Sequence, residues 1–356
     1  MNWDLAKLTP AAARRTFRRA LIVLSTLLPL ASLWFVPWTM LKMALQPLPA
    51  TIQEQLDYAT AQRFDGVVLY VSQGGQENFF ASGWNDKDAQ LVARPDALFK
   101  IASLTKLYVA VVVAKLVGHG QLSLDGTVAA YLPHLATKID NADRITLRML
   151  VQHRSGIPNY TDAQDYPWHN PGLPAGDVMA IISGQSAVFE PGTRHQYSNT
   201  NYYLIGEIIK TLGHDYGHFI RQDILDPLNL SRTFISVDQV ETDDLMSGYV
   251  IGQDHNWKGV NFASPAGSIV ASAQDVGLFL RALVDGTLMT PAEQALYSEL
   301  YAYGHTGLLP GYSSIARYHD ELDAVVVQFV NTSGTRMWSE VETNYRRVLR
   351  ILSANL

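Results

Sequence analysis

The chain has 356 residues, no cysteine and a net charge of −6 from 27 basic and 33 acidic residues. This length suffices for one large domain or two interleaved domains with a sizeable core. Because residues of both signs are scattered along the sequence, the charge gives no reason to expect a nucleic-acid partner. The absence of cysteine excludes disulfides, thiolate metal ligands and a lipid-modified cysteine, but it does not decide the redox compartment.

The N-terminal region has the features of a membrane anchor. Residues 20–41 carry no charge and consist mainly of Leu, Val, Ala, Trp and Phe, and about twenty such residues can span a bilayer. The positive-inside rule keeps the N-terminus cytoplasmic, because four arginines precede this stretch: Arg14, Arg15, Arg18 and Arg19. Interfacial aromatics, Trp34 and Trp38, lie near its far end. We therefore predict a basic cytoplasmic segment over 1–19, a transmembrane anchor or signal segment over 20–45 and one large domain over 51–356 on the extracytoplasmic side.

Three alternatives compete with a retained anchor. A buried core helix would also be apolar, but it does not explain the arginines. A cleaved signal peptide requires a small-x-small cleavage site, for which Ala50 after Leu48 and Pro49 is a weak candidate. Arg14–Phe17 has a faint similarity to a twin-arginine export signal. The length of the apolar run favours the retained anchor.

A helix and a β-hairpin are predicted next along the chain. Residues 51–63 have the apolar spacing of a helix. The runs Gly66–Ser72 and Asn78–Gly83 predict two antiparallel strands joined at Gly74–Gly75. That glycine pair is therefore interpreted as a hairpin turn and not as a phosphate-binding loop.

A long buried helix is predicted directly after Ser103. The run Tyr108–Val117 is apolar except for Lys115 and is followed by Gly118, a pattern typical of a buried helix. Ser103 and Lys106 are three residues apart and so share one face of its first turn. Free N–H groups and the helix dipole favour negative charge there, and a buried neutral amine can take the proton of a serine hydroxyl. The alternative is that Ser103 is an N-cap and Lys106 a solvated residue.

Helices are predicted through the middle of the chain, and strands return at its C-terminal end. The expected helices cover residues 145–152, 200–212, 216–224, 273–284, 291–301 and 341–352, and residues 128–132 are expected to form a short amphipathic segment. The expected C-terminal strands cover 313–318 and 324–330, and residues 160–174 form a long irregular loop near the site. We therefore predict an α+β fold (an α/β sandwich), in which an antiparallel sheet built from both ends of the chain is flanked by helices and carries an all-helical insertion.

Tyr197 and Asn199 lie in a loop just ahead of a predicted helix. A phenol whose pKa is lowered by nearby ammonium groups can act as a base, and an Asn amide can orient both Lys106 and a substrate amide. A turn aromatic beside an Asn N-cap is the alternative.

His305, Thr306 and Gly307 open an apolar stretch that predicts an edge strand. Glycine in such a strand would let a substrate backbone approach closely. The N–H of Leu308 would then be available to an oxyanion. Alone, the tripeptide is equally well an ordinary piece of strand.

Taken together and in this order, Ser103-Leu-Thr-Lys106, Tyr197-Ser-Asn199 and His305-Thr-Gly307 resemble the penicillin-recognising serine hydrolases. This family comprises penicillin-binding proteins, class C β-lactamases and their esterase and D-amino-acid peptidase relatives. The similarity covers Gly66–Leu352. Further family-like segments are Gln152–Pro158, Pro191–Gly192, Asn201–Gly206, Asp226–Leu230, Ala266–Ile269, Ser272–Asp275 and Gly307–Ser313.

The resemblance implies a role for each residue of the first two motifs. Ser103 would be the acylated nucleophile and Lys106 its proton-relay partner. Tyr197 would be the general base in acylation and the general acid toward the leaving group, while Asn199 would hold the substrate amide and Lys106. The family pattern Ser-Asp-Asn is Tyr-Ser-Asn here, which is similar to the class C and D,D-peptidase branch.

For the third motif, the resemblance implies contacts with the substrate. His305 and Thr306, beside Gly307, would face a substrate carboxylate, and the N–H groups of Ser103 and Leu308 would form the oxyanion hole. The family's Lys-Thr-Gly is His-Thr-Gly here. Histidine leaves a weaker, pH-dependent positive charge, which argues against an efficient β-lactamase.

These inferences favour a membrane-anchored serine hydrolase that acts through an acyl-enzyme on a D-alanyl peptide, an amide or an ester, as a D,D-carboxypeptidase does. The alternatives are a class C-type β-lactamase, an esterase, and an inactive member that binds peptidoglycan or a partner. The resemblance implies the inner membrane, with the domain facing the periplasm, and no cofactor or metal. His214 and His218 lack a Glu-containing zinc motif and are interpreted as structural. No Gly-x-Ser-x-Gly nucleophile elbow is present.

Overall fold

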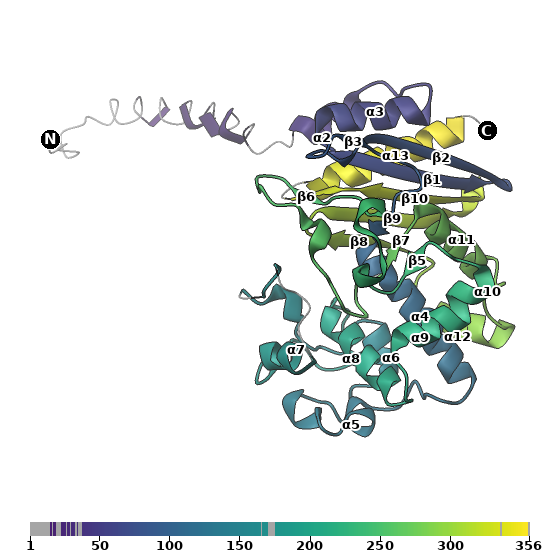
Figure 1. The fold of residues 1–356 in the computed structure, drawn as a ribbon. Coiled ribbons are helices and arrows are strands. Elements are labelled where there is room, and N and C mark those ends of the chain that lie inside the picture. Colours follow the sequence, from purple (N-terminus) through teal and green to yellow (C-terminus); the bar gives the residue numbers. More distant parts are fainter. Residues whose placement is uncertain are drawn as a thin grey trace. The chain divides into compact units, whose positions relative to one another are not determined.

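The computed structural model describes residues 15, 17–18, 23–25, 27–28, 30–32, 34, 38–164, 166–169, 175–334 and 337–354. The chain divides into two compact units, Met1–Gln46 and Pro47–Leu356. The second unit contains the sheet, the helices around it and every candidate site residue (Figure 1).

The predicted membrane location is corrected by the structure. Among the residues described, no helix is both long enough and apolar enough to cross a bilayer. Helix α2 (Trp38–Leu45) has eight residues, which extend about 12 Å as an α-helix, whereas a bilayer core is roughly 30 Å thick. Part of the expected span over 20–45 lies outside the described residues: positions 20–22, 26, 29, 33 and 35–37. This finding overturns the inner-membrane, single-pass and periplasm-facing location expected from the sequence.

An antiparallel sheet of six strands forms the centre of the second unit, in the order β3-β2-β1-β10-β9-β8. Its members are β1 (Gly66–Gln73), β2 (Gln76–Asp86), β3 (Leu91–Val92), β8 (Gly304–Leu309), β9 (Tyr312–His319) and β10 (Ala324–Val330). Val67 on β1 lies opposite Val330 on β10. The first strand of the sheet is therefore paired with its last, which confirms the predicted sheet built from both ends of the chain.

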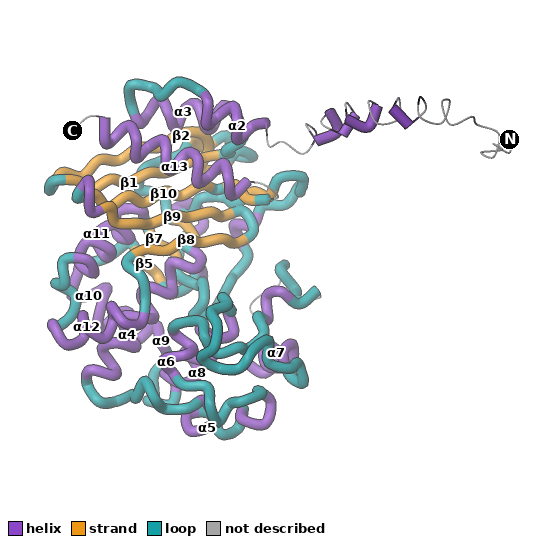
Figure 2. Tube along the Cα trace, turned by 180° about the vertical axis from the view of Figure 1, so that it is seen from behind, coloured by secondary structure: helices purple, strands orange, loops and turns teal. Residues whose placement is uncertain are grey.

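The central strands are buried because both of their faces are covered. All of β10 is buried, as are the first six residues of β1, and Val is the commonest residue in both, a composition suited to a strand packed on two sides. Helices α3 (Ile52–Gln62) and α13 (Met337–Ala354) cover one face, while α11 (Ala273–Val284) covers the other (Figures 1 and 2). This arrangement confirms the predicted α+β sandwich.

The helical part of the unit is inserted between the two halves of the sheet. It contains α4 (Thr105–Gly118), α5 (Val128–Tyr131), α6 (Leu147–Val151), α7 (Ala175–Ile182), α8 (Asn199–Lys210), α9 (Tyr216–Ile220), α10 (Asp226–Leu228) and α12 (Pro291–Leu300). Helix α4 runs from the sheet into this part (Figure 1), and Tyr108 on α4 stacks on Phe279 of α11 at 3.8 Å between ring centroids. The expected buried helix after Ser103 thus connects the two parts of the fold.

The shortest elements differ from the sequence expectation. Strands β4 (Phe99–Lys100), β7 (Val270–Ala271) and β5 (Thr233–Phe234) form a small sheet that was not predicted, and β6 (Tyr249–Val250) pairs in parallel with β11 (Thr332–Ser333). Two-residue strands are too short to show an alternating pattern, so only their tertiary partners define them.

Candidate active site

Ser103 lies in a 3₁₀ turn, η3 (Ala102–Leu104), between β4 and α4. The expected helix therefore begins two residues later than Ser103, at Thr105. Ala102 has φ +54°, a left-handed conformation that costs roughly 1–2 kcal/mol for a residue with a side chain. The turn is fixed by the surrounding sheet, because Ile101 N–H donates to Ile269 O at 3.0 Å and Ser314 Oγ donates to Ile101 O at 2.9 Å. Such local strain beside a candidate nucleophile is typical of functional sites.

Lys106 is fully buried and its Nζ has three polar neighbours. It lies 3.1 Å from Ser103 Oγ, 2.9 Å from Asn199 Oδ1 and 2.6 Å from the carbonyl oxygen of Ala266. Burial away from water lowers the pKa of Lys106 well below its usual 10.5. No carboxylate is among these partners.

Tyr197 is the second side chain in hydrogen-bond contact with Ser103. Its hydroxyl lies 2.7 Å from Ser103 Oγ, and Lys106 Nζ lies 4.9 Å from the centre of its ring. Burial raises the pKa of Tyr197 above its ordinary value of 10, whereas the sequence interpretation required a lowered pKa. Desolvation of the phenol outweighs the lowering effect of its hydrogen bond with Ser103.

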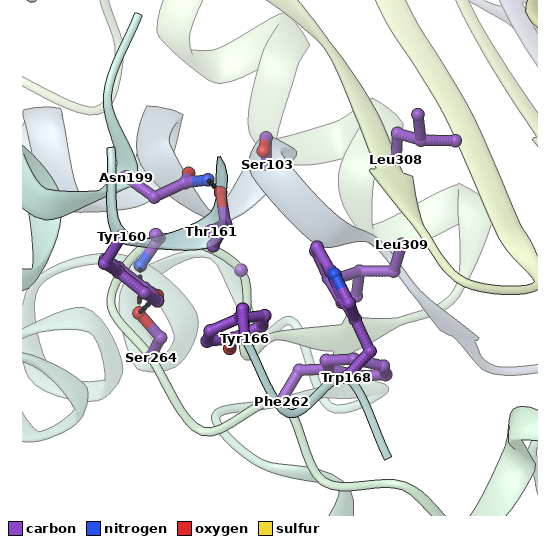
Figure 3. A pocket seen from close by; sticks show the side chains of 12 residues that line it. Ser103, Tyr160, Thr161, Tyr166, Trp168, Asn199, Phe262, Ser264, Leu308 and Leu309 are labelled. Carbon is purple, nitrogen blue, oxygen red and sulfur yellow. Dashed lines mark hydrogen bonds between the residues drawn. The ribbon is translucent and has the colours of Figure 1, made fainter. Parts of the chain in front are cut away.

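The amide of Asn199 is held in one orientation at the start of α8. Its Oδ1 accepts from Lys106, while its Nδ2 donates to Thr161 Oγ1 at 3.0 Å. The backbone N–H of Asn199 donates to Asn159 Oδ1 at 2.9 Å. Figure 3 shows Asn199 and Thr161 close together on one side of the cavity, near Ser103. The expected loop after residue 159 therefore contributes directly to the site.

His153 supports the Tyr-Ser-Asn segment and was not assigned a role from the sequence. Its Nδ1 accepts the backbone N–H of Ser198 at 3.2 Å and lies 3.2 Å from Asn201 Nδ2, and its ring lies 4.5 Å from that of Tyr197. Burial lowers the pKa of His153 to about 3, so the ring is neutral. The sequence feature that could have indicated this role of His153 was the family-like segment Gln152–Pro158.

His305 lies on β8, the edge strand that the sequence predicted. Its ring stacks on Tyr301 with 5.7 Å between centroids and is 6.3 Å from the ring of Tyr197. Burial lowers the pKa of His305 to about 4, so it carries no positive charge at neutral pH, contrary to the expected charge toward a substrate carboxylate. Thr306 follows as a half-buried residue opposite Ile315 on β9.

Gly307 lets β8 approach the serine turn. A Cβ on this residue would lie 2.3 Å from Ser314 Oγ, 2.5 Å from Ile101 O and 2.9 Å from Ala102 Cβ. The glycine therefore allows the protein's own backbone to pack closely beside Ser103. The sequence interpretation had instead expected it to allow the close approach of a substrate backbone.

We expect Gly307→Ala to destabilise the fold by about 1–3 kcal/mol, because overpacking forces the backbone apart, and to lower kcat/KM by about tenfold or more through displacement of the serine turn. Urea unfolding and ester hydrolysis would measure the two effects. Gly259→Ala is the matched control, since a Cβ there meets open space. Equal behaviour of the two variants would contradict this role of Gly307.

A cavity opens beside Ser103 and is mainly aromatic on its far side (Figure 3). Its lining residues are Ser103, Tyr160, Thr161, Tyr166, Trp168, Asn199, Phe262, Ser264, Ala266, Gly267, Leu308 and Leu309. Tyr197 and His305 line a separate cavity, together with His153, Arg154, His195 and Tyr301 among others. The structure thus brings Ser103, Lys106, Tyr197 and Asn199 into direct contact, whereas Thr306 borders neither cavity among the described lining residues.

Metal binding has no support in the described part of the chain. There, no group of three or more His, Cys, Asp or Glu side chains is arranged to hold a metal ion. His214 and His218 stack on each other with 4.0 Å between ring centroids.

Sequence comparisons identify known proteins that are similar to this chain. A sequence model of the Beta-lactamase family matches residues 48–302. Protein flp of Staphylococcus aureus (strain N315) is 31% identical over 153 residues, which are 42% of this chain and 30% of that protein. A Beta-lactamase of Pseudomonas fluorescens is 28% identical over 208 residues, which are 58% of this chain and 54% of that protein. The chain therefore spans less than two thirds of the length of each relative.

A solved structure is similar over most of this chain. The D-amino acid amidase of Ochrobactrum anthropi SV3, crystallised with L-phenylalanine amide, is 25% identical, with a TM-score of 0.74 over 85% of this chain and 98% of the amidase.

Proposed function

We propose that this chain, which belongs to the Beta-lactamase family of serine hydrolases, cleaves a small amide or ester through an acyl-enzyme formed on Ser103. The observation that carries the proposal is the contact of Ser103 Oγ with both Lys106 Nζ and the Tyr197 hydroxyl, at 3.1 and 2.7 Å. In nucleophilic catalysis, the nucleophile usually lies within hydrogen-bond distance of a base, and a third group orients that base. Here Asn199 orients the amine.

Lys106 is proposed to be the base in acylation. A neutral amine has two N–H bonds and one lone pair. Because Asn199 Oδ1 and the oxygen of Ala266 can only accept hydrogen bonds, they take the two N–H groups, and the lone pair is left for the hydroxyl proton of Ser103. As that proton moves to Nζ, Oγ bonds to the substrate carbonyl carbon, and the carbonyl oxygen takes the negative charge.

The N–H groups of Ser103 and Leu308 are proposed to hold this oxyanion. Leu308 lies on β8, next to Gly307, whose missing side chain allows the close approach to η3. Preorganised donors of this kind give large rate effects. Tyr197, whose raised pKa keeps its phenol protonated, gives its proton to the leaving nitrogen or oxygen as the bond to the carbonyl carbon breaks. The proton gained by Lys106 then replaces it, and water releases the acyl group from Ser103.

An amide or ester without an essential carboxylate is the substrate class we propose. His305 is uncharged at neutral pH because its pKa is lowered to about 4, so it offers little attraction to the terminal carboxylate of a D-alanyl peptide. The similarity to a D-amino acid amidase supports the same class. The D-alanyl carboxypeptidase activity expected from the sequence and a class C-type β-lactamase activity are the competing enzyme candidates.

The test is to trap the acyl-enzyme on the full chain with two acyl donors, a fluorescent penicillin and p-nitrophenyl acetate. Intact mass should rise by one penicillin or one acetyl group, and peptide mapping should assign the adduct to Ser103. A persistent penicillin adduct would favour a penicillin-binding protein, and rapid loss would favour a β-lactamase. An acetyl adduct without a penicillin adduct would favour an amidase or esterase. Absence of both adducts from Ser103 would refute the proposal.

A further inference from the structure

A much larger cavity lies next to the cavity at Ser103. The second cavity has a volume of about 670 Å³, and four residues border both: Tyr166, Trp168, Leu308 and Leu309. Trp168 and Leu309 lie on the side of the Ser103 cavity remote from Asn199 (Figure 3). The two cavities are therefore adjacent, and an acyl group attached to Ser103 would lie beside Tyr166 and Trp168.

Aromatic rings line both cavities. Tyr166 and Trp168 meet edge to face at 4.8 Å, and His169 stacks on Trp257 at 4.6 Å. Among the described residues that border the two cavities there is no Lys, Arg, Asp or Glu. A wall of this composition stabilises a neutral aromatic group and gives no partner to a charged one.

A buried lysine, Lys100, holds the loop that carries Trp257 in place. Lys100 Nζ donates to the carbonyl oxygens of Trp257 and Val260 at 2.8 and 2.6 Å, and it lies 5.3 Å from the centre of the Phe262 ring. Burial lowers the pKa of Lys100 to about 7. The aromatic wall is therefore attached to the same strand, β4, that leads into the serine turn, so it is held in a defined position relative to Ser103.

The position of Tyr197 decides which part of a substrate meets this wall. Tyr197 is the proposed proton donor to the leaving group, and it borders the other cavity, together with His305. The scissile bond therefore lies between the two cavities, with the leaving group on the side of Tyr197. The aromatic cavities are left for the acyl group.

We infer that this enzyme prefers acyl donors with a neutral aromatic acyl side chain over those with a methyl-sized one. The inference rests on the proposed acyl-enzyme at Ser103 and specifies its substrate class. A methyl group would leave these aromatic rings uncovered, whereas a phenyl ring would be buried against Tyr166 and Trp168.

The test compares two esters that share one leaving group, p-nitrophenyl acetate and p-nitrophenyl 3-phenylpropanoate, after correction for spontaneous hydrolysis. We expect kcat/KM for the phenylpropanoate to exceed that for the acetate by about tenfold or more, as for other apolar pockets. Trp168→Ala should reduce this ratio about tenfold, and Trp168→Phe should retain most of it. Trp84→Ala is the matched control, because Trp84 is a partly exposed tryptophan on β2 that borders neither cavity.

Boronic acids give a measurement that needs no variant. The Ser103 oxygen adds to the boron atom, its proton passes to Lys106, and a tetrahedral boronate forms. 2-Phenylethylboronic acid should inhibit at a concentration at least about tenfold lower than methylboronic acid.

The outcomes separate this inference from the function on which it rests. Ser103-dependent hydrolysis of both esters with a ratio near one, or equal inhibition by both boronic acids, would overturn the aromatic preference and leave the acyl-enzyme standing. A ratio that Trp168→Ala does not change would also overturn it. Hydrolysis that is the same in wild type and Ser103→Ala would refute the proposed function, and the inference with it.

Discussion

Replacement of Ser103 with alanine is expected to lower kcat/KM for ester or amide hydrolysis by at least about 10⁴-fold, as loss of a nucleophile does in other serine hydrolases. The substitution removes the hydroxyl oxygen that lies 3.1 Å from Lys106 Nζ and 2.7 Å from the Tyr197 hydroxyl and that would form the acyl bond. Initial rates with p-nitrophenyl acetate, together with the adduct masses described above, would measure the loss. Because the hydroxyl points into a cavity, we expect little change in melting temperature.

Ser82→Ala is the control for this experiment. Ser82 is a serine on β2 whose Oγ donates to Asp57 Oδ1, so its loss should leave hydrolysis unchanged. A ligand-binding measurement on Ser103→Ala also tests the non-enzyme alternative. Retained hydrolysis in Ser103→Ala would show that another group carries the reaction, and ligand binding without hydrolysis in the wild type would identify a binding protein.

The sheet and the long helices could be predicted because their patterns are local. A short window of sequence was enough to predict two strands from the Val-rich runs Gly66–Ser72 and Ala324–Val330. The apolar run after Ser103 predicted a buried helix in the same way. The antiparallel pairing of β1 with β10 followed from strands at both ends of the chain. The two-residue strands could not be predicted, because only their partners in space define them.

The charge states of Tyr197 and His305 could not be predicted, because they depend on burial. The sequence interpretation placed Tyr197 near an ammonium group and His305 near a substrate carboxylate, although it allowed for a buried neutral amine at Lys106. Lys106 is fully buried, whereas Tyr197 keeps 36% of its surface exposed and His305 is half-buried. Loss of solvation raises the pKa of Tyr197 and lowers those of Lys106 and His305. These shifts favour Lys106 over Tyr197 as the base. The partners that orient these groups, His153 and Ala266, lay in segments recognised only by family-like sequence.

Lys106→Met tests the assignment of the base and should lower kcat/KM by about 10² to 10⁴-fold, the range of general acid–base catalysis. Methionine has a similar volume and needs no hydrogen-bond partner, so the variant should still fold, as a circular-dichroism melt would show. Lys106→Arg should be comparably inactive, because arginine remains protonated and cannot accept the serine proton. Substantial activity in Lys106→Arg would contradict a neutral amine base.

The pH dependence of kcat/KM in the wild type gives a second test of Lys106 as the base. A base must be unprotonated, so kcat/KM should rise as the pH rises through the pKa of Lys106 and fall as the pH drops below it. Since burial lowers this pKa well below 10.5, the acid limb should lie well below pH 10.5, and it should disappear from the residual activity of Lys106→Met. Tyr197, with its raised pKa, stays protonated through neutral pH and adds no limb there. If the acid limb persisted unchanged in Lys106→Met, the titrating group would be another residue and Lys106 would not be the base.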